Sequence, residues 1–226
     1  MAMPTLSGAR TFVWDNLGMA FRSKLLSFAF LCILAAGGVA AAIIWWPKQP
    51  VVLASGTILA PARALADFSL IDNRGRSFGS ENLRGHWSLM FFGYTNCPDY
   101  CPTTLTTLAA LEKQLRAAKT VAPPQVVFVS VDARRDTPAQ LNQFVPAFDP
   151  DFVGLTATSQ PALEALAKKW GVAVNIQYAA DGNYIVDHSA VMFVIDPGGK
   201  LAAILTGPFT IDALQRDFQR IVTAGA

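Results

Sequence analysis

FFGYTNCPDYCPTT, residues 91–104, leads from an apolar run through two cysteines into a helical pattern. The apolar residues from Ser88 to Phe92 predict a strand that is buried on both faces. Pro98 suits the first position of a helix, because its missing N–H would have no partner there. The leucines that follow recur at helical spacing to about Ala118: Leu105, Leu108, Leu111 and Leu115. The two cysteines therefore lie at a predicted strand-to-helix turn.

Cys97 and Cys101 are separated by about one helical turn. Side chains four residues apart on a helix face the same way, with Cβ atoms about 5 to 6 Å apart, so the two sulfurs can close a disulfide or hold one metal ion. A helix N-terminus also favours thiolate over thiol. The spacing alone leaves open whether the pair is a structural disulfide or a reactive, metal-binding pair.

The length of 226 residues allows one membrane anchor and one domain of ordinary size, and the net charge of +2 gives no reason to expect nucleic acid. Residues 25–46 carry no charged side chain and are long enough to cross a bilayer as one transmembrane helix. Residues 1–24 carry three basic side chains against one acidic one, so the positive-inside rule predicts a cytoplasmic N-terminus. A cleaved signal peptide is the alternative, although the apolar stretch is longer than a typical signal-peptide core.

This orientation exports the larger part of the chain. We predict a single-pass protein of the inner (cytoplasmic) membrane, with a linker rich in Pro and Ala at residues 47–64. The domain at residues 65–226 is then expected in the periplasm or an equivalent exported space. Cys32 lies within the predicted span and is interpreted as an apolar filler. Cys97 and Cys101 remain outside the membrane, so they must pair with each other, a metal or a partner.

The exported part shows the pattern of a mixed α/β domain. A small hairpin at residues 68–78 precedes the cysteine strand. The elements expected after the cysteine helix are strands at 125–131 and 152–155, helices at about 138–144 and 160–170, a hairpin at 172–186, strands at 190–195 and 201–205, and a last helix from Thr210. Parallel crossover units followed by an antiparallel pair predict a thioredoxin-like mixed sheet with flanking helices. The cysteines fall at the carboxyl end of its first core strand, where open α/β sheets place their sites.

The chain has two histidines, and their predicted positions differ. His86 precedes the cysteine strand, so we expect it at the opposite end of that strand from the cysteines. His188 follows the hairpin and opens a strand predicted to be central, so it can share the cysteines' rim of the sheet. A lone histidine beside Ser and Asp is more often a structural hydrogen-bonding residue than a ligand. Because the chain also carries Cys97 and Cys101, we favour the interpretation of His188 as a metal ligand.

Two thiolates and one imidazole form a soft metal site. A site with three such ligands fits Cu(I) better than structural zinc, which takes four ligands. Cys97, Cys101 and His188 are therefore candidate copper ligands. Asp187 is a candidate to orient the His188 ring from outside the metal's own ligand shell.

A family resemblance rests on three segments. They are FFGYTNCPDYCPTT at residues 91–104, Val129-Ser130-Val131-Asp132 with Asp136-Thr137-Pro138, and Asp187-His188-Ser189. From about Ala66 to the C-terminus the chain resembles the Sco (SenC) family of cytochrome c oxidase assembly proteins. Asn96 departs from the pattern, because many relatives carry another residue there, often His. We expect Asn96 to tune binding without abolishing it.

The resemblance implies a fold, a metal and a partner. The fold is thioredoxin-like, and the copper ion, Cu(I) or Cu(II), is bound through Cys97, Cys101 and His188. The implied function is that of a copper chaperone assisting assembly of the copper A centre of cytochrome c oxidase. The implied partners are the copper A subunit of the oxidase and a copper donor protein.

Two working roles stay open. The first is a binding module without turnover that delivers copper. The alternative is a thiol-disulfide oxidoreductase that reduces the oxidase subunit's cysteines, with Cys97 and Cys101 as its redox pair. Three residues separate the cysteines, and the sequence has no proline between Gly171 and Asp196, where thioredoxin-type enzymes carry one. We therefore expect a non-enzymatic assembly factor.

Two further readings of the cysteines rank lower. A peroxiredoxin-type peroxidase carries Thr three residues before its reactive cysteine, and Tyr94 and Pro98 stand at those positions here. A purely structural disulfide leaves the match at His188 unexplained.

Overall fold

The computed structural model describes residues 31, 34, 37–38 and 51–225. The chain divides into two units, residues 1–50 and 51–226. Most of the predicted transmembrane helix, together with Cys32 and the predicted cytoplasmic N-terminus, lies outside the described residues. Within the described part of the chain, no helix is both long enough and apolar enough to cross a membrane.

The second unit alternates strands and helices. The strands are β1 (Gly56–Ala64), β2 (Ser69–Asp72), β3 (Ser77–Gly79), β4 (Ser88–Gly93), β5 (Gln125–Ser130), β6 (Val153–Thr156), β7 (Val174–Tyr178), β8 (Tyr184–His188), β9 (Val191–Ile195) and β10 (Lys200–Thr206). The helices are α2 (Tyr100–Ala118), α3 (Pro138–Phe144), α4 (Gln160–Lys169) and α5 (Ile211–Ala224), with short 3-10 turns at Ser80–Leu83 and Val145–Ala147.

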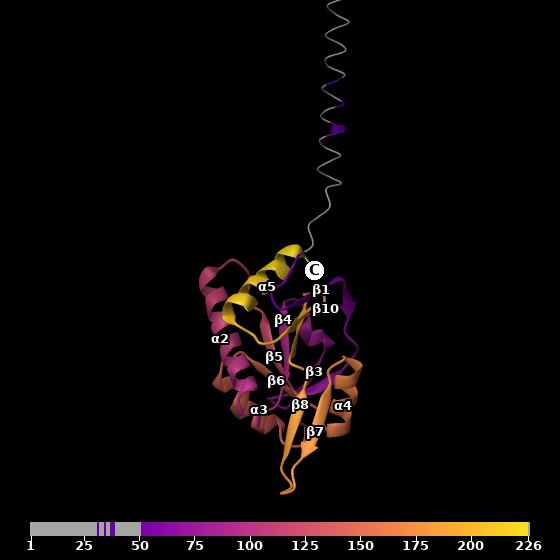
Figure 1. Ribbon diagram of the computed structural model, residues 1–226, viewed down its shortest axis with the longest axis vertical. Coiled ribbons are helices and arrows are strands. Elements are labelled where there is room, and N and C mark those ends of the chain that lie inside the picture. Colours follow the sequence, from indigo (N-terminus) through magenta and orange to yellow (C-terminus); the bar gives the residue numbers. More distant parts are fainter. Residues whose placement is uncertain (1–30, 32–33, 35–36, 39–50, 226) are drawn as a thin grey trace, which may run out of the picture. The chain divides into compact units, whose positions relative to one another are not determined.

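One mixed sheet organises this unit, in the strand order β1-β10-β9-β4-β5-β6-β2-β3. β4, β5 and β6 run parallel, whereas β9 is antiparallel to β4. β7 and β8 form a separate two-stranded sheet, which projects at the lower end of the domain in Figure 1. The predicted mixed sheet with flanking helices is thereby confirmed, and β4 is buried along its whole length, as expected.

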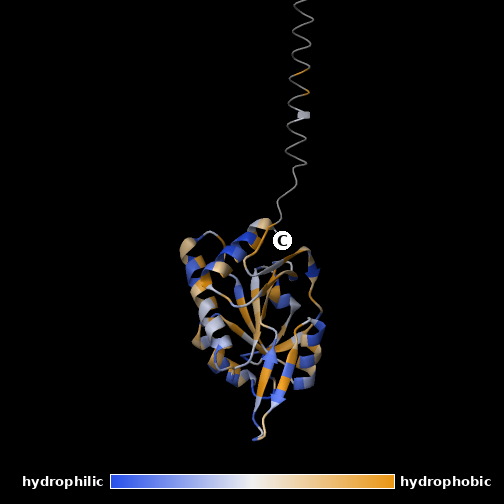
Figure 2. Cartoon of the chain, in the orientation of Figure 1, coloured by the Kyte–Doolittle hydropathy of each residue, from blue (hydrophilic) through white to orange (hydrophobic). Residues whose placement is uncertain are grey.

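Each face of the sheet packs against its own core. In β4, Leu89 and Phe91 belong to the core under α2 and α5, whereas Met90 and Phe92 belong to the core under α4. Figure 2 shows hydrophobic residues along these central strands. Fully burying one such side chain stabilises a fold by about 1.5 to 3 kcal/mol. Burial on both faces therefore fixes β4, and with it the point where the chain leaves the sheet towards the cysteines.

The beginning of the domain differs from the sequence-based expectation. The predicted linker at residues 47–64 contains β1, which pairs with β10 at the edge of the sheet. The pairing register shifts between Ile58 and Arg63, the stretch that contains Pro61. Proline is tolerated at bulges and in edge strands, and such a strand carries no regular hydrophobic alternation that the sequence could reveal. The folded part therefore begins before residue 65.

Candidate metal centre

The cysteine loop, residues 93–101, leaves the sheet at Gly93. A Cβ on Gly93 would lie 2.8 Å from the Cys101 sulfur and 2.8 Å from Cε2 of Phe128. Non-bonded carbon atoms prefer separations of about 3.5 to 4.0 Å, so a side chain here would collide with both. The Gly93 carbonyl accepts the N–H of Val131 at 2.8 Å. Glycine thus lets the paired end of β4 pass directly against the buried sulfur.

The start of α2 differs from the prediction. The helix begins at Tyr100, two residues after Pro98, so Cys97 lies in the loop and Cys101 in the first turn. The Cys97 N–H donates to the carbonyl oxygen of Tyr94 at 3.2 Å, which makes a turn before the helix. The Cys97 sulfur accepts the N–H of Cys101 at 3.4 Å. The two cysteines are therefore neighbours, as expected, although one of them is not helical.

The two thiols have different environments. Cys97 is half-buried and Cys101 is fully buried, and both are free. Burial raises the pKa of the Cys101 thiol, and a backbone hydrogen bond from Tyr94, which lowers it, does not compensate. The expectation that the thiolate is favoured is therefore wrong for Cys101, because desolvation of the buried sulfur outweighs the hydrogen bond that would stabilise the charge. A metal that binds there displaces the proton.

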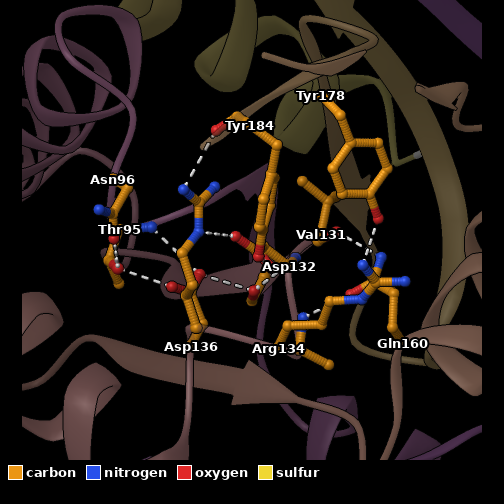
Figure 3. Close-up of polar contacts among 12 residues, drawn as sticks. Thr95, Asn96, Val131, Asp132, Arg134, Asp136, Gln160, Tyr178 and Tyr184 are labelled. Atoms are coloured by element: carbon orange, nitrogen blue, oxygen red, sulfur yellow. Dashed lines mark hydrogen bonds and ion pairs between the residues drawn. The ribbon is translucent and has the colours of Figure 1, made fainter. Parts of the chain in front are cut away.

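A buried carboxylate, Asp136, anchors the cysteine loop. Its Oδ2 accepts the Thr95 N–H at 3.0 Å and the Ser130 hydroxyl at 2.7 Å, and its Oδ1 accepts the Thr95 hydroxyl at 2.6 Å (Figure 3). Burial raises the pKa of Asp136, against the lowering effect of these hydrogen bonds. The sequence Asp136-Thr137-Pro138 is typical of a helix start, and Thr137 does cap α3 by accepting the N–H of Gln140 at 3.2 Å, whereas the Asp136 carboxylate turns to the cysteine loop. The sequence did not indicate that Asp136 anchors the cysteine loop.

His188 is the last residue of β8, whereas we expected it to open the next strand. Its Nδ1 lies 3.1 Å from the carbonyl oxygen of Ser189. Because a carbonyl oxygen accepts hydrogen bonds and donates none, Nδ1 carries the proton and Nε2 keeps its lone pair. Burial lowers the pKa of His188, although the Ser189 carbonyl and Asp187 oppose the shift. The lowered pKa favours the neutral ring, and the Ser189 carbonyl favours its Nδ1–H tautomer, which binds metals through Nε2.

The structure gives Asp187, the expected orienting residue, and His86, the second histidine, different environments. Asp187 is exposed and accepts a hydrogen bond from Gln177, so the Ser189 carbonyl, and not Asp187, orients the His188 ring. Neighbours along a strand point to opposite faces, which explains why the two side chains diverge. His86 lies at the opposite end of β4, as expected, with its Nε2 2.8 Å from Oε1 of Gln125.

Tyr94 contacts both parts of the candidate site. Its ring stands edge-on to the His188 ring, with centroids 6.1 Å apart and an interplanar angle of 87°, while its carbonyl oxygen holds the Cys97 N–H. Among the residues that the structure describes, no three His, Cys, Asp or Glu side chains lie close enough to hold one metal ion. The structure therefore brings Cys97 and Cys101 together and packs His188 against Tyr94 of the same loop.

The donor chemistry of these residues suits copper. Two thiols and an imidazole Nε2 are the soft and borderline ligands that Cu(I) prefers. Three donors are also one short of the four that close a structural zinc site.

Comparison with known proteins extends this picture. Residues 57–223 match the model of the SCO1/SenC family. A protein of Stutzerimonas stutzeri that is proposed to bind copper is 35% identical over 202 residues, which cover 89% of this chain and 95% of that protein. The mitochondrial SCO2 homologue of Bos taurus is 37% identical over 138 residues, which cover 59% of this chain and 50% of that protein.

Solved structures of Sco proteins are also similar to this chain. Arabidopsis thaliana ScoI with copper bound has a TM-score of 0.66 and 31% identity, covering 70% of this chain and 98% of that chain. Yeast Sco1 with copper bound has a TM-score of 0.64 and 28% identity, covering 72% of this chain and 90% of that chain. These similarities confirm the thioredoxin-like mixed α/β fold. The family match extends from β1 into α5, and the chain belongs to the SCO1/SenC family.

Proposed function

We propose that this protein binds copper through Cys97, Cys101 and His188 and acts as a copper chaperone in the assembly of cytochrome c oxidase. The proposal is supported by the pair of free cysteines and by His188, whose ring packs against Tyr94 of the cysteine loop and whose Nδ1 faces the Ser189 carbonyl. Two structural relatives with copper bound support the choice of metal. BsSco, which shares the fold at 24% identity and a TM-score of 0.57, is described as a member of the Sco family of cytochrome c oxidase assembly proteins.

The environments of the ligands suggest how copper is transferred. Copper is the cargo, and the half-buried Cys97 is the ligand that an incoming or outgoing thiolate reaches first. Cys101 is buried in the core and retains the ion while Cys97 exchanges. His188 completes the ligand set from the hairpin. A copper donor protein and the copper A subunit of the oxidase are the proposed exchange partners.

The ligand set is tested with the full chain, reduced and loaded with Cu(I) under anaerobic conditions. We expect one tightly bound equivalent. His188→Ala should weaken binding by at least about tenfold, because changes that merely perturb a ligand already cost about 10- to 100-fold. Cys97→Ser and Cys101→Ser should weaken it further.

His86→Ala is the matched control, because His86 is the other histidine and lies at the opposite end of β4. It should leave copper affinity unchanged. Full copper affinity in His188→Ala would remove His188 from the ligand set.

The contrast between a half-buried and a fully buried thiol also suits a thiol-disulfide oxidoreductase. The Cys97 thiolate would attack a partner disulfide, forming a mixed disulfide and releasing one partner thiolate. Cys101, as thiolate, would then attack the Cys97 sulfur, releasing the second partner thiolate and leaving a Cys97–Cys101 disulfide. His188→Ala separates the two roles, since it keeps both thiols. Normal oxidase assembly by a His188→Ala protein that has lost copper would make reduction the working function.

The membrane topology is a separate proposal. Residues 25–46 form one transmembrane helix, residues 1–24 face the cytoplasm, and the copper-binding domain is exported to the periplasm or an equivalent space, as the distribution of charges indicates. A reporter fused after Ala226 should be active outside the cytoplasm. Cytoplasmic activity of that fusion would overturn the orientation.

A further inference from the structure

The hairpin that carries His188 has little backbone support of its own. β7 and β8 hydrogen-bond to each other and form a sheet separate from the eight-stranded one. An isolated two-stranded hairpin is at best marginally stable in water. Side-chain contacts with the rest of the domain must therefore hold it in place.

Arg135 supplies such a contact. The central carbon of its guanidinium lies 3.8 Å from the centre of the Tyr184 ring, at the start of β8. Its Nη1 donates to the Tyr184 carbonyl oxygen at 3.2 Å. The same carbon lies 5.6 Å from the centre of the Tyr94 ring in the cysteine loop. One guanidinium thus contacts both the hairpin and the loop.

Asp132 fixes the orientation of this guanidinium. It is fully buried at the carboxyl end of β5 and forms an ion pair with Nε of Arg135. Its other carboxylate oxygen accepts the Tyr184 hydroxyl at 2.8 Å, as Figure 3 shows. Asp132, Arg135 and Tyr184 form a closed ring of contacts, and a buried charge held in this way has one favoured geometry.

The neighbouring Arg134 provides a natural contrast. It is exposed, and it contacts Tyr178 at the end of β7, with its guanidinium carbon 5.9 Å from the centre of that ring. No buried carboxylate orients it among the described ion pairs. Two adjacent arginines thus reach the same hairpin, one through a partly buried ring of contacts around Asp132 and one through a solvated pair.

We propose that Arg135 is a positioning residue that clamps the His188 hairpin against the cysteine loop and so sets the position of His188 relative to Cys97 and Cys101. The link runs through Tyr94, whose ring packs against His188 and whose carbonyl oxygen holds the Cys97 N–H. The clamp itself is a property of the metal-free protein. Its consequence for the metal rests on the copper-binding function proposed above.

Arg135→Lys tests the clamp, because lysine keeps a positive charge for Asp132 but loses the planar group that stacks on tyrosine and bonds its carbonyl. In the reduced, metal-free full chain, we expect amide hydrogen exchange across residues 174–188 to become about tenfold faster, from the loss of one stacking contact and one hydrogen bond. Exchange in β4 and β5 should not change. Arg134→Lys is the matched control. It should change hydrogen exchange neither in residues 174–188 nor in β4 and β5.

A second readout follows the metal. With Cu(II) added alone, Arg135→Lys should shift the sulfur-to-copper absorption bands of the complex, whereas Arg134→Lys should give the wild-type spectrum. Unchanged hairpin exchange in Arg135→Lys overturns the clamp. Faster hairpin exchange with an unchanged copper spectrum overturns the positioning role.

Tyr184→Phe is the second variant, for the case that Arg135→Lys does not fold. It keeps the aromatic ring and removes the hydroxyl that bonds Asp132, so hairpin exchange should become about threefold faster. Unchanged exchange in this variant likewise overturns the clamp. If His188→Ala leaves copper binding intact, the proposed ligand set fails, while the exchange data on the metal-free protein still decide the clamp.

Discussion

The cysteine loop and the β7–β8 hairpin carry different parts of the candidate copper site, and different forces hold them. The loop joins the fully buried β4 to α2, and the buried Asp136 holds it through Thr95. The hairpin belongs to a separate two-stranded sheet, and its Ile185 is 55% exposed. The core therefore encloses β4 and Cys101 completely, whereas the hairpin reaches the core mainly through Val186 and keeps exposed residues on its other face. We expect loop changes to reduce global stability and hairpin changes to reduce local stability.

Asp136→Ala should have the largest effect on this comparison. It leaves the Thr95 N–H and the Ser130 hydroxyl without their acceptor in a buried place. We expect the free energy of unfolding to fall by about 2 to 4 kcal/mol, measured by chemical denaturation. Ser189→Ala is the matched hairpin change, because it removes the acceptor of the Ala173 N–H and should cost about 1 kcal/mol or less. Equal losses of unfolding free energy in the two variants would contradict the expected difference between the loop and the hairpin.

Gly93→Ala should have the next largest effect, because its new Cβ meets Cys101 and Phe128 at 2.8 Å. Overpacking of this kind costs about 1 to 3 kcal/mol and should appear as a lower Tm. Ile185→Ala, on the exposed side of the hairpin, should change stability by about 0.5 kcal/mol or less. A Gly93→Ala protein as stable as the wild type would show that the loop adapts as easily as the hairpin.

The pH dependence of the hairpin should be the smallest effect. Burial holds the pKa of His188 below its ordinary value, so the open hairpin binds a proton more readily than the closed one. The contribution of His188 is therefore present above the ordinary histidine pKa, near 6.5, and is lost as the pH falls through the depressed value. Hydrogen exchange in residues 174–188, corrected for its intrinsic pH dependence, should become faster on acidification, while β4 stays protected.

His188→Ala should remove this pH dependence, and His86→Ala should keep it. A wild-type hairpin whose corrected exchange does not depend on pH would contradict the assignment of the titration to His188.

Local patterns in the sequence determined much of this molecule. The apolar run before Gly93, the leucines of α2 and the hairpin pattern at residues 172–186 each indicated an element that the structure contains. Such signals work because burial on both faces, helical spacing and turn conformation depend on residues that are close in the chain. The spacing of the two cysteines likewise indicated that they would be neighbours, and the types of the three candidate ligands indicated copper.

Tertiary structure alone decided the environments of these residues. Asp136 bonds Thr95 from 41 positions away, and Arg135 bonds Tyr184 from 49 positions away, so no local pattern could place either contact. The raised pKa of Cys101 and the lowered pKa of His188 both follow from burial, which depends on how distant segments pack around a group. The sequence therefore determined which residues are candidate ligands, and the packing of distant segments decided their protonation and what holds them in place.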